Sequence, residues 1–329
     1  MEPGQSDRLT LARAFPLMPA QRIDAELDFM HRHGIDVLDR TTDGWPARLS
    51  VCFDAPAALF RLGRCPLDLP HTVAIVGTRR ATVTGTDFTR RLVLDLADRL
   101  DGLCIISGLA YGIDVAAHQA ALEAGVPTIA VVAHGLNTIY PAEHRDVARR
   151  IVQQGGAIVS EYVSGTPGRR GNFLDRNRIV AGLSDVTVVA ESAQHGGSLV
   201  TARHALRYGR KVVAAPYRWN DAAGRGCNEL IASGNARMIL DAEGIMDVAG
   251  WTECAKVRAE AARLDLATPV LTPEMKRITD RLRQSPDDTL SELSQVLQMP
   301  VNELSALLME MEMDDLLTAL PGSRYKLNF

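Results

Sequence analysis

Four arginines, an asparagine and an aromatic residue fall within ten positions of this chain, and together they have the chemistry to bind an anionic polymer. They are Arg169, Arg170, Phe173, Arg176, Asn177 and Arg178. Arginine side chains contact phosphates, and an aromatic ring stacks on a nucleic-acid base of any identity. This composition favours a nucleic-acid contact over a solvated charge cluster with Phe173 in the core.

Short glycine-containing turns provide a second set of anion-binding groups. Gly77-Thr78-Arg79-Arg80 follows an apolar run, Ser107-Gly108 ends another, and Gly197-Ser198 lies shortly after a third. Glycine allows the backbone to approach a ligand closely, while amides at a helix start donate to phosphate. The pattern is neither G-x-G-x-x-G nor G-x-x-x-x-G-K-[ST], so a dinucleotide or ATP site is not indicated. We expect an extended anion-binding edge rather than one small-molecule pocket.

Two pairs of residues also suggest catalysis. Asp114 and His118 are one helical turn apart and could form an acid–base or metal pair, although a helix-start carboxylate with a packing histidine is the more common arrangement. His195 precedes Ser198, but no third partner is placed and the turn is not G-x-S-x-G. We therefore expect no catalytic residue, no metal and no cofactor.

These turns require a scaffold of alternating strands and helices. Apolar runs of strand length occur at 72–76, 103–107, 128–132, 157–160, 186–190 and 212–215. Amphipathic stretches separate them, among others at 87–100, 115–124, 142–153 and 199–208. This alternation predicts an α/β core at 67–250: a Rossmann-like, doubly wound and mostly parallel sheet. Ligands are expected at the carboxyl ends of its strands.

The flanking segments have a different character. Residues 1–66 look mostly helical and are predicted to form a small domain. Residues 251–271 are predicted to be a linker. Residues 272–329 contain three helical segments near 274–283, 290–297 and 301–313, followed by a hairpin with Pro321-Gly322 at its turn. Three helices and a hairpin predict a winged helix.

Charge and composition indicate which part of the chain could bind nucleic acid and in which compartment the protein is expected. Residues 71–250 carry 19 basic and 17 acidic side chains, whereas residues 265–329 carry 6 and 11. Nucleic acid is therefore expected at the middle of the chain. The five cysteines lack C-x-x-C spacing, and we expect no membrane span and no signal peptide. We expect a cytoplasmic protein.

Six motifs in fixed order resemble the DprA/Smf (DNA-processing protein A) family over about residues 70–250. They are Gly77-Thr78-Arg79, Ser107 to Asp114 with His118, Tyr140-Pro141, Arg176 to Ser184, Gly197 to Ala202 and Asn228-Glu229-Leu230-Ile231. The helical N-terminal segment resembles the family's SAM-like domain. The chain departs from the family at Phe173-Leu174, where F-P is common, and at Ala215-Pro216-Tyr217, where V-P-G is common.

The resemblance implies a function as well as a fold. It implies a core that forms a homodimer, binds single-stranded DNA in a basic pocket, protects incoming DNA during natural transformation and loads the RecA recombinase. By position, Arg79 matches the family's pocket arginine, and Arg170 with Phe173 matches its backbone-contact and base-stacking pair. Arg176 and Arg178 belong to its R-N-R motif.

The turn at 196–201 and the winged helix leave two other functions open, a nucleotide phosphoribohydrolase and a transcription factor. The turn at 196–201 distantly resembles that of a Rossmann-like nucleotide phosphoribohydrolase, but His204 stands where that family has its glutamate. A transcription factor would use the winged helix, yet its presumed recognition helix carries Glu303, Glu310 and Glu312 and no basic residue. Because phosphate repels such a helix, we expect this domain to contact protein, with Arg324 and Lys326 as its only candidates for DNA contact.

Overall fold

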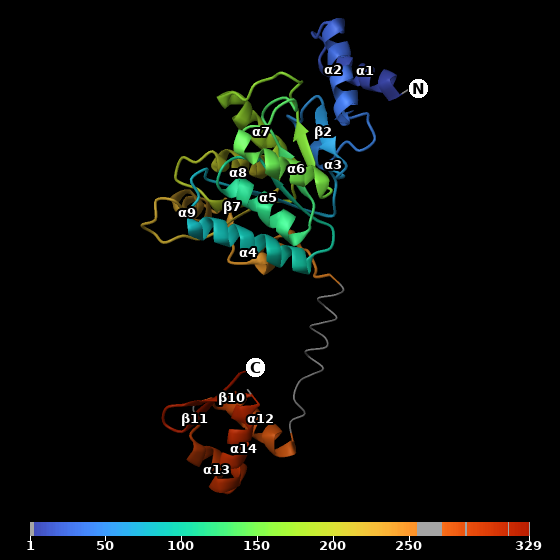
Figure 1. Ribbon diagram of the computed structural model, residues 1–329. Coiled ribbons are helices and arrows are strands. Elements are labelled where there is room, and N and C mark those ends of the chain that lie inside the picture. The colour runs from blue at the N-terminus through green and yellow to red at the C-terminus, as the bar shows by residue number, and fades with distance from the viewer. Residues whose placement is uncertain (1–2, 255–271, 287, 315, 329) are drawn as a thin grey trace. The chain divides into compact units, whose positions relative to one another are not determined.

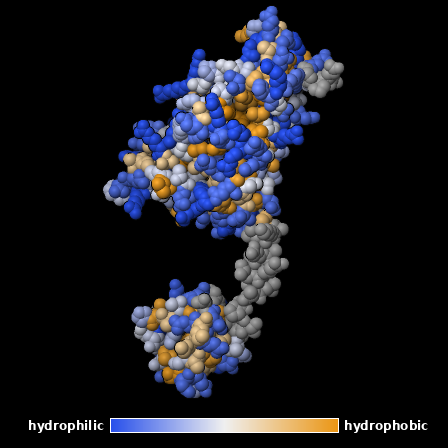
Figure 2. Space-filling model, in the orientation of Figure 1, coloured by the Kyte–Doolittle hydropathy of each residue, from blue (hydrophilic) through white to orange (hydrophobic). Residues whose placement is uncertain are grey.

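The computed structural model describes residues 3–254 and 272–328 apart from positions 287 and 315 (Figure 1). Its internal contacts divide the chain into two compact units, Met1–Arg258 and Ala259–Phe329. Each unit has its own hydrophobic core, and the visible face of each is mostly hydrophilic with smaller apolar patches (Figure 2). None of the described helices is long and apolar enough to cross a membrane.

A nine-stranded sheet forms the centre of the first unit. Its strand order is β1-β2-β6-β5-β4-β3-β7-β8-β9. All neighbouring strands from β6 to β9 are parallel, whereas β1 and β2 are antiparallel additions at one edge. The strands are Ile35–Leu38 (β1), Leu59–Gly63 (β2), His71–Gly77 (β3), Leu103–Ser107 (β4), Thr128–Val131 (β5), Ala157–Ser160 (β6), Val186–Glu191 (β7), Lys211–Ala214 (β8) and Arg237–Met238 (β9). The six predicted strands are β3 to β8, so the doubly wound core is confirmed.

Helices cover both faces of this sheet, as the continuous burial of its strands requires. In β3, Val73 and Ile75 pack on one side and Ala74 and Val76 on the other. The first face is covered by α4 (Val83–Arg99), α5 (Ile113–Ala124) and α10 (Ala242–Ala249), with α6 (Arg145–Gln153) and the short 3-10 helix η1 (Ala142–His144) farther along. The second is covered by α3 (Ala47–Ser50), α7 (Arg170–Gly182), α8 (Ser198–Arg207) and α9 (Arg225–Ala232).

The chain changes direction across the sheet between β3 and β7. These strands are parallel neighbours, but β3 leads through α4 to β4 on one side and β7 leads through α8 to β8 on the other. In open α/β sheets, such a switch point leaves a crevice at the carboxyl ends of the strands where ligands bind. The turns at Gly77 and Gly197 both lie there.

The N-terminal segment is only partly as expected. Helices α1 (Pro3–Ala14) and α2 (Ala20–His33) are present, but β1 and β2 were not predicted as strands. In β2, Leu59 packs into the core of the large sheet while Phe60 packs under α2. Burial on both faces of a five-residue run removes the alternation by which a strand is recognised in sequence.

The structure bears differently on the two predicted domain boundaries that flank the core. Because β2 pairs with β6, residues 1–66 are hydrogen-bonded into the sheet of the core, and their separation as a domain stays a prediction. Of the predicted linker at 251–271, residues 255–271 lie outside the described residues.

The second unit is the expected winged helix. It consists of α12 (Pro273–Gln284), α13 (Leu290–Leu297), α14 (Val301–Met313) and a hairpin of β10 (Leu317–Leu320) and β11 (Arg324–Leu327). Thr272 and Thr289 cap α12 and α13, as short polar side chains do at helix starts. Leu293, Leu304 and Leu308 lie in its core, while Met309 and Met313 are exposed on α14.

Candidate nucleic-acid interface

The turn after β3 presents two arginines to solvent. Its backbone is fixed by a hydrogen bond from the Thr78 amide to the Glu191 carbonyl at 2.8 Å, which joins it to the end of β7. The Arg80 amide donates to Thr78 Oγ1 at 3.2 Å. Arg79 and Arg80 are both exposed and, within the described part of the chain, form no ion pair. Their charges are available to a ligand.

The turn after β4 packs against the turn after β3. The Ser107 hydroxyl donates to the Ile75 carbonyl at 2.6 Å and is fully buried, so it ties β4 to β3 and does not face a ligand. Gly112 has a φ of 75°, and a Cβ there would lie 2.2 Å from the Thr78 carbonyl oxygen. Only glycine therefore allows the two turns to pack together.

The start of α7 brings an aromatic ring to the same edge. Phe173 is half-buried, and the Arg79 guanidinium carbon lies 5.1 Å from its ring centre. Tyr140, which is exposed, lies with its ring centre 5.6 Å from that of Phe173. Residues from the turn after β3, from the segment before η1 and from α7 thus meet in one cluster. Arg169 and Arg170 are exposed at the N-terminal end of the same helix.

Sequence reasoning placed Arg79 and Phe173 in the site but assigned no contact to Tyr140. The Tyr140-Pro141 motif had been noted only as part of the resemblance. The signal available in the sequence was an aromatic residue in a glycine- and asparagine-containing segment that follows a predicted strand.

The loop between β6 and α7 leads into the helix that carries Phe173, and α2 (Ala20–His33) holds this loop in place. The buried Glu26 carboxylate of α2 accepts from the Ser164 amide at 2.8 Å and from its hydroxyl at 2.5 Å. Arg22 pairs with Glu26 at 2.8 Å and donates to the Ser164 carbonyl at 2.5 Å. Every polar group of Ser164 is therefore bound by α2. This positioning was missed, because nothing in the sequence links residues 22 and 26 to residue 164.

The R-N-R motif is turned largely away from the surface. Arg176 is buried and donates to the Val131 carbonyl, and its guanidinium lies against Gly108, where a Cβ would lie 1.9 Å from a guanidinium nitrogen. Burial lowers the pKa of Arg176, while the nearby Asp114 carboxylate opposes that shift. The guanidinium thus supports the turn at Gly108 from within.

The other two side chains of the motif have protein partners as well. Arg178 pairs with Glu161 at 2.6 Å, and the Asn177 amide donates to the Gly197 carbonyl at 3.4 Å. Asn177 thereby connects α7 to the turn after β7. The structure places these three residues near the predicted edge but directs their polar groups to the protein.

The turn after β7 completes the edge. Ser198 is buried, its hydroxyl lies 2.9 Å from that of Ser192, and it begins α8 behind the exposed Gly197. At the neighbouring α4, the Glu191 carboxylate accepts from the Thr82 amide at 2.8 Å. An internal carboxylate therefore already occupies the amide end of α4, and the positive charge of the crevice comes from Arg79 and Arg80.

Asp114 and His118 are a helix-start carboxylate and a packing histidine rather than an acid–base pair. His118 is fully buried with Nδ1 2.7 Å from the Thr128 hydroxyl, and burial lowers the pKa of its ring to about 3. Asp114 is also buried, and desolvation raises its pKa against the effects of Arg176 and of backbone amides. Neither group faces a ligand.

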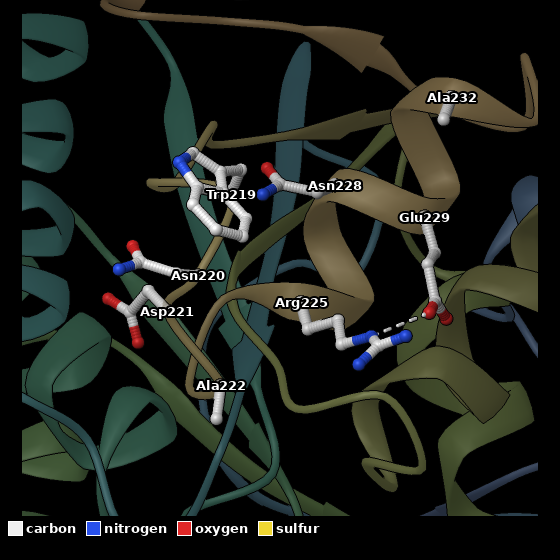
Figure 3. A pocket seen from close by; sticks show the side chains of 8 residues that line it. All are labelled: Trp219, Asn220, Asp221, Ala222, Arg225, Asn228, Glu229 and Ala232. Carbon is white, nitrogen blue, oxygen red and sulfur yellow. Dashed lines mark hydrogen bonds and ion pairs between the residues drawn. The ribbon is translucent and has the colours of Figure 1, made fainter.

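A separate hollow lies beside α9 (Figure 3). Trp219 on the preceding loop is 91% exposed, and Arg225 of α9 reaches across to Glu229 at 3.2 Å. Because its arginine is paired and Asp221 adds a carboxylate, this hollow has no excess positive charge. We do not include it in the candidate interface.

Comparison with known proteins shows which family the chain is similar to. A family model described as DNA recombination-mediator protein A matches residues 36–250, and one described as the DprA winged helix domain matches residues 262–323. Protein Smf of Escherichia coli is 34% identical over 98% of this chain and 86% of its own. DNA processing protein DprA of Streptococcus pneumoniae is 36% identical over 68% of this chain and 77% of its own.

Two solved structures are similar as well. The X-ray structure of DNA processing protein A from Streptococcus pneumoniae matches 74% of this chain and 92% of its own with a TM-score of 0.61 and 30% identity. DNA processing protein A from Helicobacter pylori, described as having a unique single-stranded DNA binding mode, matches 65% and 94% with a TM-score of 0.58 and 34% identity.

Proposed function

Because the chain belongs to the DNA recombination-mediator protein A family, we propose that it binds single-stranded DNA at the carboxyl edge of its sheet. Arg79, Arg80 and Arg170 contact phosphates, and a base stacks on Phe173. The observation that carries this proposal is the position of the Arg79 guanidinium 5.1 Å from the Phe173 ring centre, at a solvent-facing edge. The cation lies over the ring, so one nucleotide can place its phosphate at Arg79 and its base against Phe173 where the guanidinium does not cover the ring.

The geometry supports a single strand rather than a duplex. Stacking on a side chain requires a base that is not already stacked and paired, and an isolated ring cannot reach bases inside B-form DNA. Phosphate contact and stacking read no base edges, so sequence preference is slight. Of the other predicted residues, Gly77, Thr78, Ser107, Gly108, Asn177, Gly197 and Ser198 shape the turns, and Arg169 adds charge.

The wider role follows from the family. We propose that the protein acts in the cytoplasm as a recombination mediator that protects incoming single strands in natural transformation and loads the RecA recombinase. No chemical step is part of the proposal, since Asp114 and His118 are buried. A homodimer through the core is supported by the open edge at β9, where Met238 and Leu240 are exposed.

The winged helix is proposed to contact protein rather than DNA. Its α14 carries Glu303, Glu310 and Glu312, and the exposed methionines Met309 and Met313 lie on the same helix. Flexible methionine side chains suit protein surfaces that adapt to a partner. Acidic side chains there disfavour phosphate.

The phosphoribohydrolase alternative gains no support from the site. It would need a carboxylate in the last turn of α8, where His204 packs against Tyr208 with ring centres 6.1 Å apart. Incubation with nucleoside monophosphates, followed by detection of free base, tests it directly.

The proposed function is tested by fluorescence anisotropy with labelled oligo-dT and a duplex control. The wild type and an Arg79→Ala/Arg170→Ala double variant are compared across salt. For single strands, the log–log salt slope is about −0.7 per phosphate neutralised. We expect tight single-strand binding that the double variant weakens, with a shallower slope. Equal binding by the variant, or none by the wild type, would overturn the proposal.

A further inference from the structure

A groove between α4 and α5 begins at the same arginines as the candidate interface. It is a hollow of about 650 Å³ whose lining includes Arg79, Arg80, Val83, Thr86 and Gln119. We call it the α4–α5 groove. Arg79 lines this groove and also lies over the Phe173 ring. The two features are therefore joined at one side chain.

The surface of the groove has the character of a nucleotide subsite. Val83 at the first position of α4 is 86% exposed, and Val115, Ala116 and Ala120 of α5 add small apolar side chains. Gln119 adds an amide that can meet the edge of a base, and the Thr86 hydroxyl, which donates to the Val83 carbonyl, can still accept a hydrogen bond. Apolar surface beside a few polar groups is typical of ligand sites.

The charges in the groove are arranged for an anion at its entrance. Its two carboxylates are already paired, because Glu123 is held by Arg90 through two nitrogens and Asp87 is 2.9 Å from Arg91. Arg79 and Arg80 at the entrance form no ion pair with other described residues. A phosphate therefore meets two cations there and no uncompensated carboxylate beyond them.

We propose that the α4–α5 groove is a second subsite for the same DNA strand, receiving the nucleotides adjacent to the one stacked on Phe173. This inference rests on the proposed function. A phosphate held by Arg79 and Arg80 lies between the two subsites, so the strand runs from the ring at α7 across the turn after β3 and along α4. A longer strand then gains contacts that a short one cannot make.

The test introduces a carboxylate into the groove and an equal one elsewhere. Val83→Glu adds it at the first residue of α4, where a negative charge suits the helix dipole. Val301→Glu is the matched control, because Val301 is also the first residue of a helix and is 49% exposed. Gln119→Glu in the groove and Gln295→Glu on α13 form a second, isosteric pair at exposed positions.

Binding is measured with a short oligo-dT of about 3 nucleotides and a long one of about 20, which lie below and above the common single-strand site sizes of about 4–16 nucleotides. At about 0.15 M salt, exposed charges are screened beyond roughly 8 Å. Under these conditions we expect Val83→Glu and Gln119→Glu each to weaken binding of the long strand about fivefold. The short strand and both control variants should stay within about twofold of wild type.

The outcomes separate this inference from the proposed function. If Phe173→Ala weakens binding of both strands while the groove variants bind with the same affinity as their controls, the groove is not a subsite and the Phe173 site stands. If the controls weaken the long strand as much as the groove variants do, net charge explains the effect and the inference fails. If Phe173→Ala leaves the short strand unaffected, the proposed function itself fails.

Discussion

Replacing Phe173 with alanine removes the surface on which a base is proposed to stack. The ring lies under Arg79 and beside Tyr140 and Gly168, and it is half-buried at the start of α7. Alanine favours the helix and leaves the arginines in place. The change therefore tests stacking separately from charge.

The expected loss can be worked out from stacking alone. Removing an aromatic platform costs about 1–3 kcal/mol per base, and about 1.4 kcal/mol corresponds to tenfold in affinity. Phe173→Ala should therefore lower the affinity for the short oligo-dT by about 5- to 150-fold. Phe53 is the matched control, because it is 63% exposed and has the Arg207 guanidinium 4.7 Å from its ring centre.

The assay is an anisotropy titration of the short oligo-dT with wild type, Phe173→Ala and Phe53→Ala. Urea unfolding of each variant checks that the fold is retained. Phe53→Ala should bind as the wild type does, since a ring under an arginine away from the carboxyl edge has no proposed role. The reasoning is refuted if the two variants bind equally well, or if Phe173→Ala retains wild-type affinity while remaining folded.

Three further predictions concern the supporting residues and the second unit. Arg176→Ala should lower the free energy of unfolding by about 2–5 kcal/mol in urea, because it leaves a cavity beside Gly108 and the Val131 carbonyl without its donor. The folded-state pKa of His118 is about 3 and its ordinary value is 6.5, so the unfolded chain binds a proton that the folded chain does not. Stability should therefore fall as pH drops below 6.5, by up to about 1.4 kcal/mol per pH unit from this group, and His118→Gln should reduce that slope. Deleting residues 272–329 should leave oligo-dT affinity within about twofold, because the acidic α14 does not attract phosphate.

Each of these has a result that contradicts it. For Arg176, the exposed Arg80→Ala serves as the control, and equal stability of the two variants would show that burial of Arg176 is not important for folding. For His118, an unchanged pH slope in the glutamine variant would mean that other groups set it. For the second unit, a large loss of salt-dependent affinity on deletion would place DNA on the winged helix.

The order of strands and helices in the core was predictable, and so was the winged helix. Buried parallel strands leave continuous apolar runs, and each run from β3 to β8 is bounded by glycine or polar residues that end it. The winged helix has short polar caps at α12 and α13. The strands β1 and β2 could not be found this way, because β2 pairs with β6, which lies about a hundred residues away, and β1 joins the sheet only through β2.

The site was predictable in its location but less so in its orientation. Arg79 and Phe173 lie together at the predicted edge of the sheet, but Arg176 faces inward. Its spacing from Ile179 and Val180, the core-facing stripe of α7, does indicate that direction. Charge alone suggested a surface contact, and helical periodicity outweighs it here. The hold of Glu26 on Ser164 depends on tertiary packing, for which no local pattern exists.

That hold has a consequence for the thermodynamics of binding. A loop that must become ordered when DNA arrives loses conformational entropy at that moment, and the loss is subtracted from affinity. Here the backbone and the hydroxyl of Ser164 are already fixed by α2 through Glu26 and Arg22. If the proposed site binds DNA, the cost of ordering this loop has been met during folding, and α2, which is remote in sequence from the proposed contact residues, should help set the affinity.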